Sequence, residues 1–424
     1  MRLCATVTQL SFLKTTFPIT ILNERECIYM KTNVAVFFGG RSVEHEISII
    51  SAVQAMSNFD REKYNIIPVY MTKQSVFYSG EKLLDIDCFR CGTYEKDGFP
   101  VTFVVKSDKV VMISLEKGLF KKNTETVIDV AFPIVHGTNS EDGSIQGFLE
   151  TLNLPYVGCD VMSSALGMDK VLFKNVLLDR NIPTLRCVDF GARDWALKSD
   201  EIVERIEKEI GLPLIVKPAN LGSSVGISKV ESKAELRNAI DVACSFADRV
   251  LVEHAVSKLR EINCSVLGER DNCSASALEE PIMHDKILSY DDKYRANSGK
   301  SGSKGMASLS RKLPADLNEN KAEEIKNIAI ETFKAIGASG VVRIDFLLDG
   351  DQDDKVYVNE INTIPGSLSF YLWEATGVKY PELIDKLISL AFKRQRDRKN
   401  TMFTIDTNIL NESSFGAKGS KGKI

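Results

Sequence analysis

The sequence lacks the patterns that mark several broad classes of protein. Its formal net charge is only −4, so no excess of one sign attracts it to nucleic acid. No apolar run approaches the roughly 20 residues that a membrane-spanning helix needs. Its nine cysteines follow no repeating spacing, which in a chain of 424 residues favours reduced thiols over a disulfide framework. These absences predict a soluble cytoplasmic protein with no nucleic-acid or membrane partner.

Three familiar site motifs are incomplete. Cys88 and Cys91 form a C-x-x-C pair, but no second pair of Cys or His stands at a spacing that would close a zinc site, so we interpret them as ordinary thiols. The glycine turn at 39–40 lacks G-x-G-x-x-G, so a nicotinamide cofactor is not supported. The loop at 222–226 lacks the G-K-[ST] of a P-loop.

Length and patterning predict several domains, because a chain of this size can bury more than one core. Residues 1–30 show no clear periodicity, and the end of the chain alternates Gly, Ser and Lys. We predict five segments: a non-core extension at 1–30, an N-terminal domain at 31–158, a central domain at 159–256, a C-terminal domain at 257–397 and a flexible tail at 398–424.

The N-terminal domain alternates strand and helix patterns. Strands are expected at 32–40, 65–71 and 127–135, and helices at 46–59 and 143–152. This alternation indicates an open α/β sheet, whose ligands bind beyond the carboxyl ends of the strands. Glu44 and His136 follow two such ends. On local pattern alone, however, Ser42 is a simple helix cap with Glu44 or Glu46 in the first turn.

The glycine- and serine-rich loop at 222–226 joins two predicted strands, at 214–217 and 226–230. Its glycines allow backbone N–H groups to approach phosphate closely, and Lys217 supplies a positive charge at the end of the first strand. The pattern suggests a β-hairpin that covers phosphates. The alternative is an ordinary turn.

Two further predicted strands, at 340–348 and 355–361, carry polar side chains on alternating positions. Arg343 and Asp345 share one face of the first strand, and Glu360 and Asn362 share one face of the second. Hard oxygen ligands of this kind suit Mg²⁺ together with substrate phosphates. Arg343 is suited to stabilise a transferring phosphoryl group or an oxyanion. The alternative is a solvated face with cross-strand ion pairs.

In order and spacing, these motifs resemble the D-alanine–D-alanine ligases of the ATP-grasp superfamily over residues 31–395. The matching runs are 38–48, 136–143, 168–170, 216–218, 222–226, 293–294, 343–345 and 359–366. The resemblance implies an α/β fold of the ATP-grasp type (α+β), in which an N-terminal open α/β sheet domain is followed by two ATP-grasp subdomains. ATP would lie between those two subdomains.

The resemblance also implies which residues bind ATP and metal. The expected ATP-binding residues are Lys170, Lys217, Ser223, Ser224, Glu253, Glu261 and Lys293. Among them, Lys170 and Lys217 would contact phosphates, with Glu253 near the adenine and Glu261 at the ribose. Two Mg²⁺ ions, with Mn²⁺ as the alternative, would be held by three residues. These are Asp345, Glu360 and Asn362.

The implied reaction joins two D-alanine molecules through an acyl phosphate, releasing ADP and phosphate, for bacterial peptidoglycan synthesis. Glu44 would bind the ammonium of the first D-alanine, linked to Ser223 and Tyr294 in a lid contact. His136 would lie near the substrate carboxylate. Arg343 and the N–H of Gly366 would stabilise the tetrahedral oxyanion. The family likeness also implies a homodimer.

The chain departs from the family pattern in two places. Counting from the shared motif puts Tyr371 where the family commonly has a small hydroxyl residue that binds the second substrate's carboxylate; Ser367 and Ser369 are alternatives. The stretch at 295–311 is rich in Gly, Ser and Lys, which predicts a differently shaped lid. Alternative functions are D-alanine–D-serine or D-alanine–D-lactate ligation, although Tyr294 favours an amine acceptor, and ATP binding without catalysis.

Overall fold

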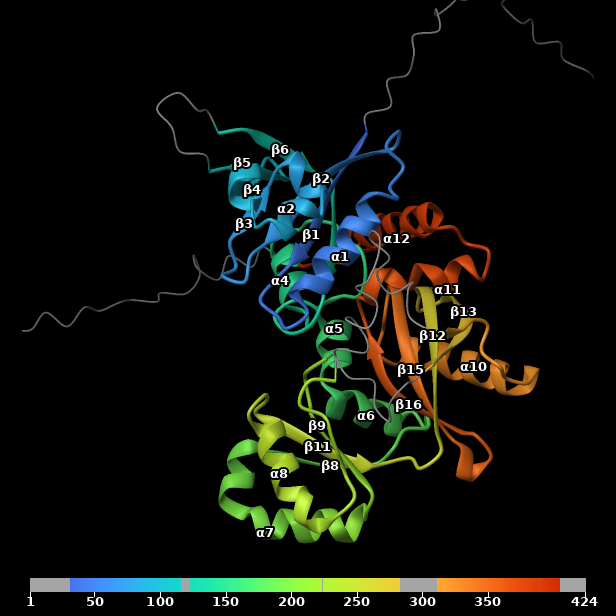
Figure 1. Ribbon diagram of the computed structural model, residues 1–424. Helices are drawn as coiled ribbons and strands as arrows, with labels where there is room; N and C mark the ends of the chain where they lie inside the picture. Colours follow the sequence, from blue (N-terminus) through green and yellow to red (C-terminus); the bar gives the residue numbers. More distant parts are fainter. Residues whose placement is uncertain (1–30, 116–122, 223, 283–310, 405–424) are drawn as a thin grey trace, which may run out of the picture.

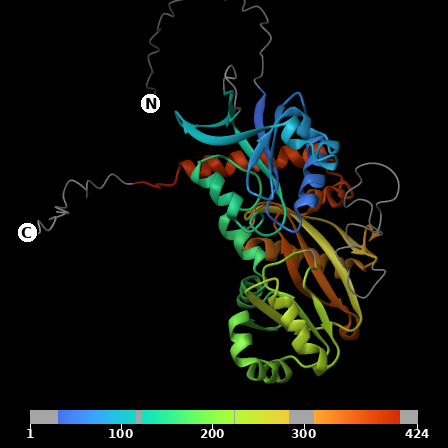
Figure 2. The ribbon, with the colours of Figure 1, turned by 60° about the vertical axis from the view of Figure 1, so that its left-hand side comes forward.

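The computed structural model describes residues 31–115, 123–222, 224–282 and 311–404 (Figure 1). The predicted extension at 1–30 and most of the predicted tail lie outside these ranges, as do Ser223, Lys293 and Tyr294. The described chain forms three β-sheets, of seven, four and five strands. Two views place the five-stranded sheet between the other two (Figures 1 and 2). Every described helix is too short or too polar to cross a membrane.

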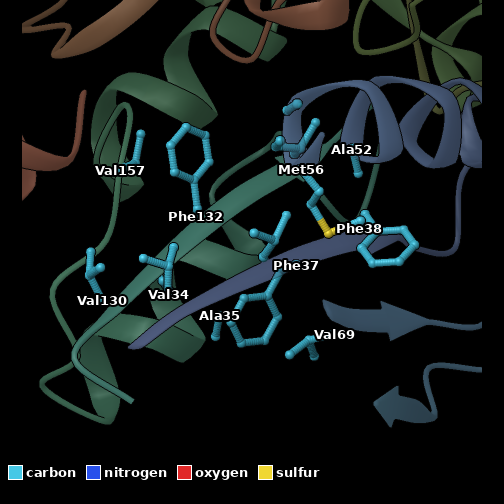
Figure 3. Packing of buried hydrophobic residues seen from close by; sticks show 14 of the residues in the cluster. Val34, Ala35, Phe37, Phe38, Ala52, Met56, Val69, Val130, Phe132 and Val157 are labelled. Atoms are coloured by element: carbon cyan, nitrogen blue, oxygen red, sulfur yellow. The ribbon is translucent and has the colours of Figure 1, made fainter. Parts of the chain in front are cut away.

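The seven-stranded sheet forms the N-terminal part of the molecule. Its strands, in spatial order, are β6 (Glu125–Ile128), β5 (Lys109–Ser114), β4 (Phe99–Lys106), β3 (Phe77–Ser79), β2 (Tyr64–Met71), β1 (Thr32–Gly39) and β7 (Val130–Val135). The parallel strands β2, β1 and β7 are the ones with continuous apolar runs, as expected for strands covered on both faces. Phe37, Phe38 and Phe132 are almost completely buried in this core (Figure 3).

The strand expected at 127–135 is two strands. β6 pairs with β5, whereas β7 pairs with β1. Between them, Asp129 accepts a hydrogen bond from the N–H of Asn33 at 2.8 Å and donates its own N–H to the Asn33 carbonyl at 3.0 Å. The segment therefore changes partners at Asp129, the one charged residue within the apolar run at 127–135.

The four-stranded sheet has the order β10 (Ser228–Val230), β9 (Leu214–Pro218), β11 (Arg249–His254) and β8 (Cys187–Gly191). Its core is shared with α7 (Ala192–Glu209) and α8 (Lys233–Cys244), which lie together at one end of the molecule (Figure 1). β9 and β10 are antiparallel, with Val216 opposite Ser228. The β-hairpin predicted around the glycine- and serine-rich loop is confirmed.

The five-stranded sheet is antiparallel. Its order is β14 (Arg311–Lys312), β13 (Asn272–Pro281), β12 (Leu259–Glu269), β15 (Gly340–Asp349) and β16 (Lys355–Asn362). Its core is shared with α6 (Lys170–Asp179) and α10 (Glu319–Ala335). Helix α12 (Tyr380–Lys399) comes later in the chain, and its Leu383, Ile384 and Leu387 pack in the core of the seven-stranded sheet. The last helix thereby ties the two sheets together.

Shorter elements connect these layers. They are α1 (His45–Met56), η1 (Glu81–Leu84), α2 (Asp87–Arg90), α3 (Tyr94–Asp97), α4 (Ser144–Thr151), α5 (Val161–Met168), η3 (Gly350–Gln352), η4 (Gly366–Ser369) and α11 (Phe370–Glu374). Two of them matter for the site, because α1 follows β1 and η4 follows β16, and the two pack against each other. This contact brings the N-terminal sheet to the end of the five-stranded sheet.

Candidate active site

A cleft of about 370 Å³ lies between the four-stranded and five-stranded sheets. Five of the residues predicted to bind ATP line it, together with one predicted metal ligand, Glu360. The five are Lys170, Lys217, Ser224, Glu253 and Glu261. Asp345 also reaches its wall. These residues are spread over positions 170–360 of the sequence, so the fold assembles in one place what the sequence presents as separate motifs.

Glu253 is the centre of a buried charge cluster. Its carboxylate pairs with Lys217 at 2.5 Å and with Lys174 at 2.9 Å, and all three side chains are at most 5% exposed. Burial alone would raise the pKa of Glu253, but Lys174 and Lys217 lower it to about 2. The carboxylate expected near the adenine therefore fixes the position of Lys217.

Lys174 was not predicted from the sequence. It lies one helical turn after Lys170 on α6, so both lysines are on the same helix face, which also buries Val171 and Leu177. The sequence feature that could have pointed to Lys174 is a pair of lysines four residues apart on an otherwise apolar helix face. Lys170 reaches the other side of the cleft, where its Nζ lies 3.4 Å from Glu360 and donates to the Leu221 carbonyl at 2.8 Å.

The predicted metal ligands meet across β15 and β16. Asp345 is opposite Glu360, and Arg343 is opposite Asn362. The Arg343 guanidinium binds both oxygens of Asp345, at 2.6 and 2.7 Å, and Asn362 donates to the same carboxylate at 3.2 Å. Burial acts to lower the pKa of Arg343, but Asp345 raises it well above its usual value, so the guanidinium stays charged.

This donor set fits Mg²⁺. Two carboxylates and an amide oxygen stand at one end of the sheet, and the carboxylate side chains keep 17% and 26% exposure toward the cleft. Mg²⁺ takes few protein ligands and completes its octahedron with water and substrate phosphate. Among the described residues, no three His, Cys, Asp or Glu side chains form a group that could hold a metal ion by themselves.

Glu44 stands at the end of β1, in front of α1. Its backbone N–H donates to Ser42 Oγ at 2.9 Å, and Ser42 Oγ donates to the His136 carbonyl at 2.6 Å. Ser42 thus joins the ends of β1 and β7, and the helix starts at His45 without a side-chain cap. A methyl group added at Gly137 or Gly222 would lie 2.8 or 2.9 Å from the Glu44 carboxylate. Only glycine leaves room for that carboxylate.

His136 is buried beside α1 and η4. Its Nε2 lies 3.0 Å from Ser51 Oγ, which also accepts the N–H of Ser367 at 3.1 Å. Burial lowers the pKa of His136 to about 4. The ring is therefore neutral near pH 7 and can serve as a hydrogen-bond donor but not as a cation.

Glu141 is a second residue with no role predicted from the sequence. Its carboxylate accepts the N–H of Ile364 at 2.8 Å and the N–H of Gly137 at 3.3 Å. Burial, and then the neighbouring charge of Glu44, raise the pKa of Glu141 to about 7. This carboxylate links the loop after β7 to the turn after β16.

The turn that begins at Gly366 is strained. Ser367, Leu368 and Ser369 have φ values of 49°, 56° and 51°, a left-handed conformation that costs energy for residues with a Cβ. The turn leads to Tyr371, which is 7% exposed and donates its hydroxyl to Glu279 at 3.0 Å. Tyr371 is therefore near Arg343 but already bonded. Strained turns of this kind are common where backbone groups must face a substrate.

The combined arrangement is suited to phosphoryl transfer followed by acyl transfer. The predicted phosphate contacts Lys170 and Lys217 line the cleft with Asp345 and Glu360. Arg343 binds Asp345, and the Glu44 carboxylate lies close to Gly222, which also lines the cleft. Ser224 lines the cleft, whereas the positions of Ser223, Lys293 and Tyr294 lie outside the described residues.

Comparisons with known proteins place the chain in a family. Residues 33–159 match the family model for the D-ala D-ala ligase N-terminus, and residues 176–389 match that for the D-ala D-ala ligase C-terminus. The chain is 42% identical over 380 residues to the D-alanine–D-alanine ligase of Thermosipho melanesiensis, covering 89% of this chain and 98% of that protein.

Solved structures give the same result. The D-alanine-D-alanine ligase from Coxiella burnetii superposes with a TM-score of 0.74 at 33% identity, covering 87% of this chain and 96% of that one. The VanG D-Ala:D-Ser ligase from Enterococcus faecalis gives a TM-score of 0.69 at 30% identity, covering 85% and 100%. The ATP-grasp fold class predicted from the motifs is confirmed, and the chain belongs to the D-alanine–D-alanine ligase family.

Proposed function

We propose that this site joins two D-alanine molecules to D-alanyl-D-alanine with cleavage of ATP to ADP and phosphate, as a step of cell-wall peptidoglycan synthesis. The observation that carries the proposal is the convergence of Lys170, Lys217, Asp345 and Glu360 on one cleft, with Arg343 bound to Asp345. A site that only binds nucleotide has no need of Arg343 and Gly366 beyond the phosphate end.

In the first half-reaction, a carboxylate oxygen of the first D-alanine attacks the γ-phosphorus of ATP. A bond forms between that oxygen and phosphorus, and the bond to ADP breaks, giving an acyl phosphate. Lys170 and Lys217 neutralise the phosphates and orient them for in-line transfer. Asp345, Glu360 and Asn362 would hold two Mg²⁺ ions, which neutralise developing charge on the phosphoryl oxygens.

In the second half-reaction, the unprotonated amine of the second D-alanine attacks the acyl carbonyl. Carbon–nitrogen bond formation gives a tetrahedral oxyanion. It collapses as the carbon–oxygen bond to phosphate breaks, and the proton lost by the amine nitrogen leaves with the phosphate as HPO4²⁻. Arg343 and the backbone N–H of Gly366 stabilise that oxyanion. The charge of Arg343 is secured by Asp345, so the group is a permanent cation at the place where negative charge develops.

Glu44 holds the ammonium of the first D-alanine, and neutral His136 lies near its carboxylate. Glu261 binds the ribose, and Ser223, Ser224 and Lys293 complete the phosphate contacts. Ser223 and Tyr294 would close over the site, because an acyl phosphate exposed to water hydrolyses. Support for the Glu44 assignment is the close approach of Gly137 and Gly222 to its carboxylate.

The proposal extends to the domain limits, the oligomeric state and compartment, the metal ion and the acceptor. The domains are 31–158, 159–256 and 257–397, and three separate sheets support this division. The protein is a homodimer of the cytoplasm, as the family likeness suggests. Mn²⁺ can replace Mg²⁺, since it accepts the same hard oxygen ligands. D-Serine is the second candidate acceptor, because a D-Ala:D-Ser ligase is 30% identical to this chain.

The test is ADP release by the purified full-length protein with ATP, Mg²⁺ and D-alanine, with products identified by mass. L-Alanine alone is the negative control, and D-alanine with D-serine or D-lactate tests the acceptor. We expect ADP release that requires D-alanine and yields its dipeptide. ADP release that is equal with and without D-alanine would overturn the proposal, and a mixed product as the main species would favour the alternative acceptor.

A further inference from the structure

A row of polar side chains crosses the five-stranded sheet. Strand register pairs Glu279 with Asn263, Asn263 with Asp345, and Asp345 with Glu360. Register partners on neighbouring strands point to the same face of a sheet. The row therefore begins at the proposed metal ligands and ends two strands away at Glu279, a carboxylate for which ATP and metal binding give no reason.

Glu279 gathers three hydrogen-bond donors. It accepts from Asn263 Nδ2 at 2.8 Å, from the Tyr371 hydroxyl at 3.0 Å and from Arg311 at 2.7 Å. Glu279 is only 3% exposed, so these contacts are shielded from water. The Arg311 guanidinium also lies 4.1 Å from the centre of the Tyr371 ring, a cation–π contact. Helix α11 brings Tyr371 here because it packs beside β13 (Figure 1).

The hydroxyl groups near this place are not suited to bind a substrate carboxylate. A phenol has one hydrogen to donate, and Tyr371 gives it to Glu279. Burial, and then the charge of Glu279, raise the pKa of Tyr371, so the phenol keeps that hydrogen. Ser367 donates its hydroxyl to Gln54 at 2.7 Å, and Ser369 is completely buried. A carboxylate receptor must therefore come from another group.

We propose that Arg311 binds the carboxylate of the second D-alanine and so selects the acceptor, with Glu279 and Tyr371 as positioning residues. This inference rests on the proposed ligase function. A guanidinium carries five N–H donors in a planar fork, so it can serve Glu279 and a substrate carboxylate together. Solvent still reaches part of this cluster, because the Arg311 side chain is 11% exposed.

The position of Arg311 matches the chemistry of the second half-reaction. The Arg311 guanidinium lies over the Tyr371 ring, and Arg343 is close enough to act on the charge of the same phenol. In an α-amino acid the amine and the carboxylate are attached to one carbon. A carboxylate held at Arg311 therefore directs the amine toward Arg343, where the acyl carbonyl is attacked.

The test is a competition between two acceptors in the full-length protein. D-Alanine and D-alaninamide, which lacks the carboxylate, are mixed with ATP and Mg²⁺, and the ratio of dipeptide to dipeptide amide is measured by mass. Arg311→Gln should lower this ratio roughly 10- to 100-fold, since a charge-assisted contact is lost. Arg311→Lys keeps the charge without the fork and should lower it by a smaller factor.

A second measurement isolates the first half-reaction. Hydroxylamine attacks the acyl phosphate in place of the second D-alanine, releasing phosphate and forming a hydroxamate. The rate of hydroxamate formation should stay near wild type in Arg311→Gln, because the first D-alanine does not use Arg311. No hydroxamate from the wild-type protein would mean that the ligase function itself is wrong.

The matched control is Arg260→Gln. Arg260 pairs with Glu280 at 2.9 and 3.1 Å, one residue along from Glu279 and on the opposite face of the sheet. This variant loses a similar ion pair and should keep the wild-type product ratio. An unchanged ratio in Arg311→Gln, or an equal fall in Arg260→Gln, would overturn the proposal. If Arg311→Gln does not fold, an unchanged product ratio in Arg311→Lys would also overturn the proposal.

Discussion

At the two ends of the proposed active site, the pKa of a buried carboxylate shifts in opposite directions. At the phosphate end, Glu253 is enclosed by Lys174 and Lys217, and its pKa falls to about 2 against the effect of burial. At the substrate end, burial and the neighbouring Glu44 raise the pKa of Glu141 to about 7. One end carries an excess of cations and the other places two carboxylates close together.

The site therefore has an electrostatic polarity, with cations at one end and carboxylates at the other. A polyphosphate is attracted to the lysine end, and an ammonium group to the carboxylate end. A D-alanine zwitterion between them would point its ammonium toward Glu44 and its carboxylate toward the phosphate. The arrangement thus favours the orientation in which that carboxylate can attack the γ-phosphorus.

We expect the largest loss of activity when one of the proposed metal ligands, Glu360, is changed. Glu360→Gln keeps the shape of the side chain but removes a charge that would hold Mg²⁺. We expect turnover to fall by about 10³-fold or more, with the fold intact. ADP release measured over a range of Mg²⁺ concentrations checks this. Near-normal activity with the same Mg²⁺ dependence would remove Glu360 from the site.

The buried lysine cluster should dominate stability. Lys174→Met leaves Glu253 with one cation instead of two, and breaking a buried ion pair typically costs about 3–5 kcal/mol. Urea unfolding, monitored by circular dichroism, measures the change in the free energy of unfolding.

The control for this variant is Lys233→Met. Lys233 pairs with Glu207 at 2.7 Å, but its side chain is 71% exposed, so its loss should cost less than about 1 kcal/mol. Equal losses in the two variants would show that burial does not distinguish these ion pairs.

The sequence predicted the phosphate end better than the substrate end, for a physical reason. Alternation along a strand places Arg343 with Asp345, and Glu360 with Asn362, and β15 and β16 are neighbours in sequence as well as in space. Lys217 was predicted at the end of β9 for the same reason, since a strand has a simple periodicity.

Contacts between distant segments could not be predicted in this way. Lys174 becomes a partner of Glu253 only when α6 packs on the four-stranded sheet, and Glu141 meets Ile364 across 223 positions of sequence. β12 and β13 mix polar and apolar residues on both faces, so the strand patterns did not reveal them. The Arg311–Glu279 pair was hidden for the same reason.

The substrate end should respond to pH in the opposite sense from ordinary ion pairs. The pKa of Glu141 rises from 4.5 to about 7 on folding, so the unfolded chain loses this proton first as the pH rises. The contribution to stability is therefore lost progressively between about pH 4.5 and pH 7, on the order of 2–3 kcal/mol in all.

Glu141→Gln tests this slope. The amide cannot ionise but still offers an oxygen to the N–H of Ile364, so the variant should gain stability relative to wild type as the pH rises toward 7. Thermal unfolding at several pH values measures the difference. A parallel pH dependence in the two proteins would mean that folding does not shift the pKa of Glu141.

The smallest effect separates two serines within the strained turn. Ser367 donates its hydroxyl to Gln54, whereas the Ser369 hydroxyl is buried and has no hydrogen-bond partner in the described parts of the chain. Ser367→Ala should therefore destabilise the protein by about 1 kcal/mol, because it removes a bond and leaves the Gln54 oxygen without its donor. Ser369→Ala should be neutral or slightly stabilising, since it removes a buried polar atom that gains nothing in the fold. Thermal unfolding of both variants gives the comparison, and a larger loss in Ser369→Ala would mean that its hydroxyl has a role that the turn itself does not explain.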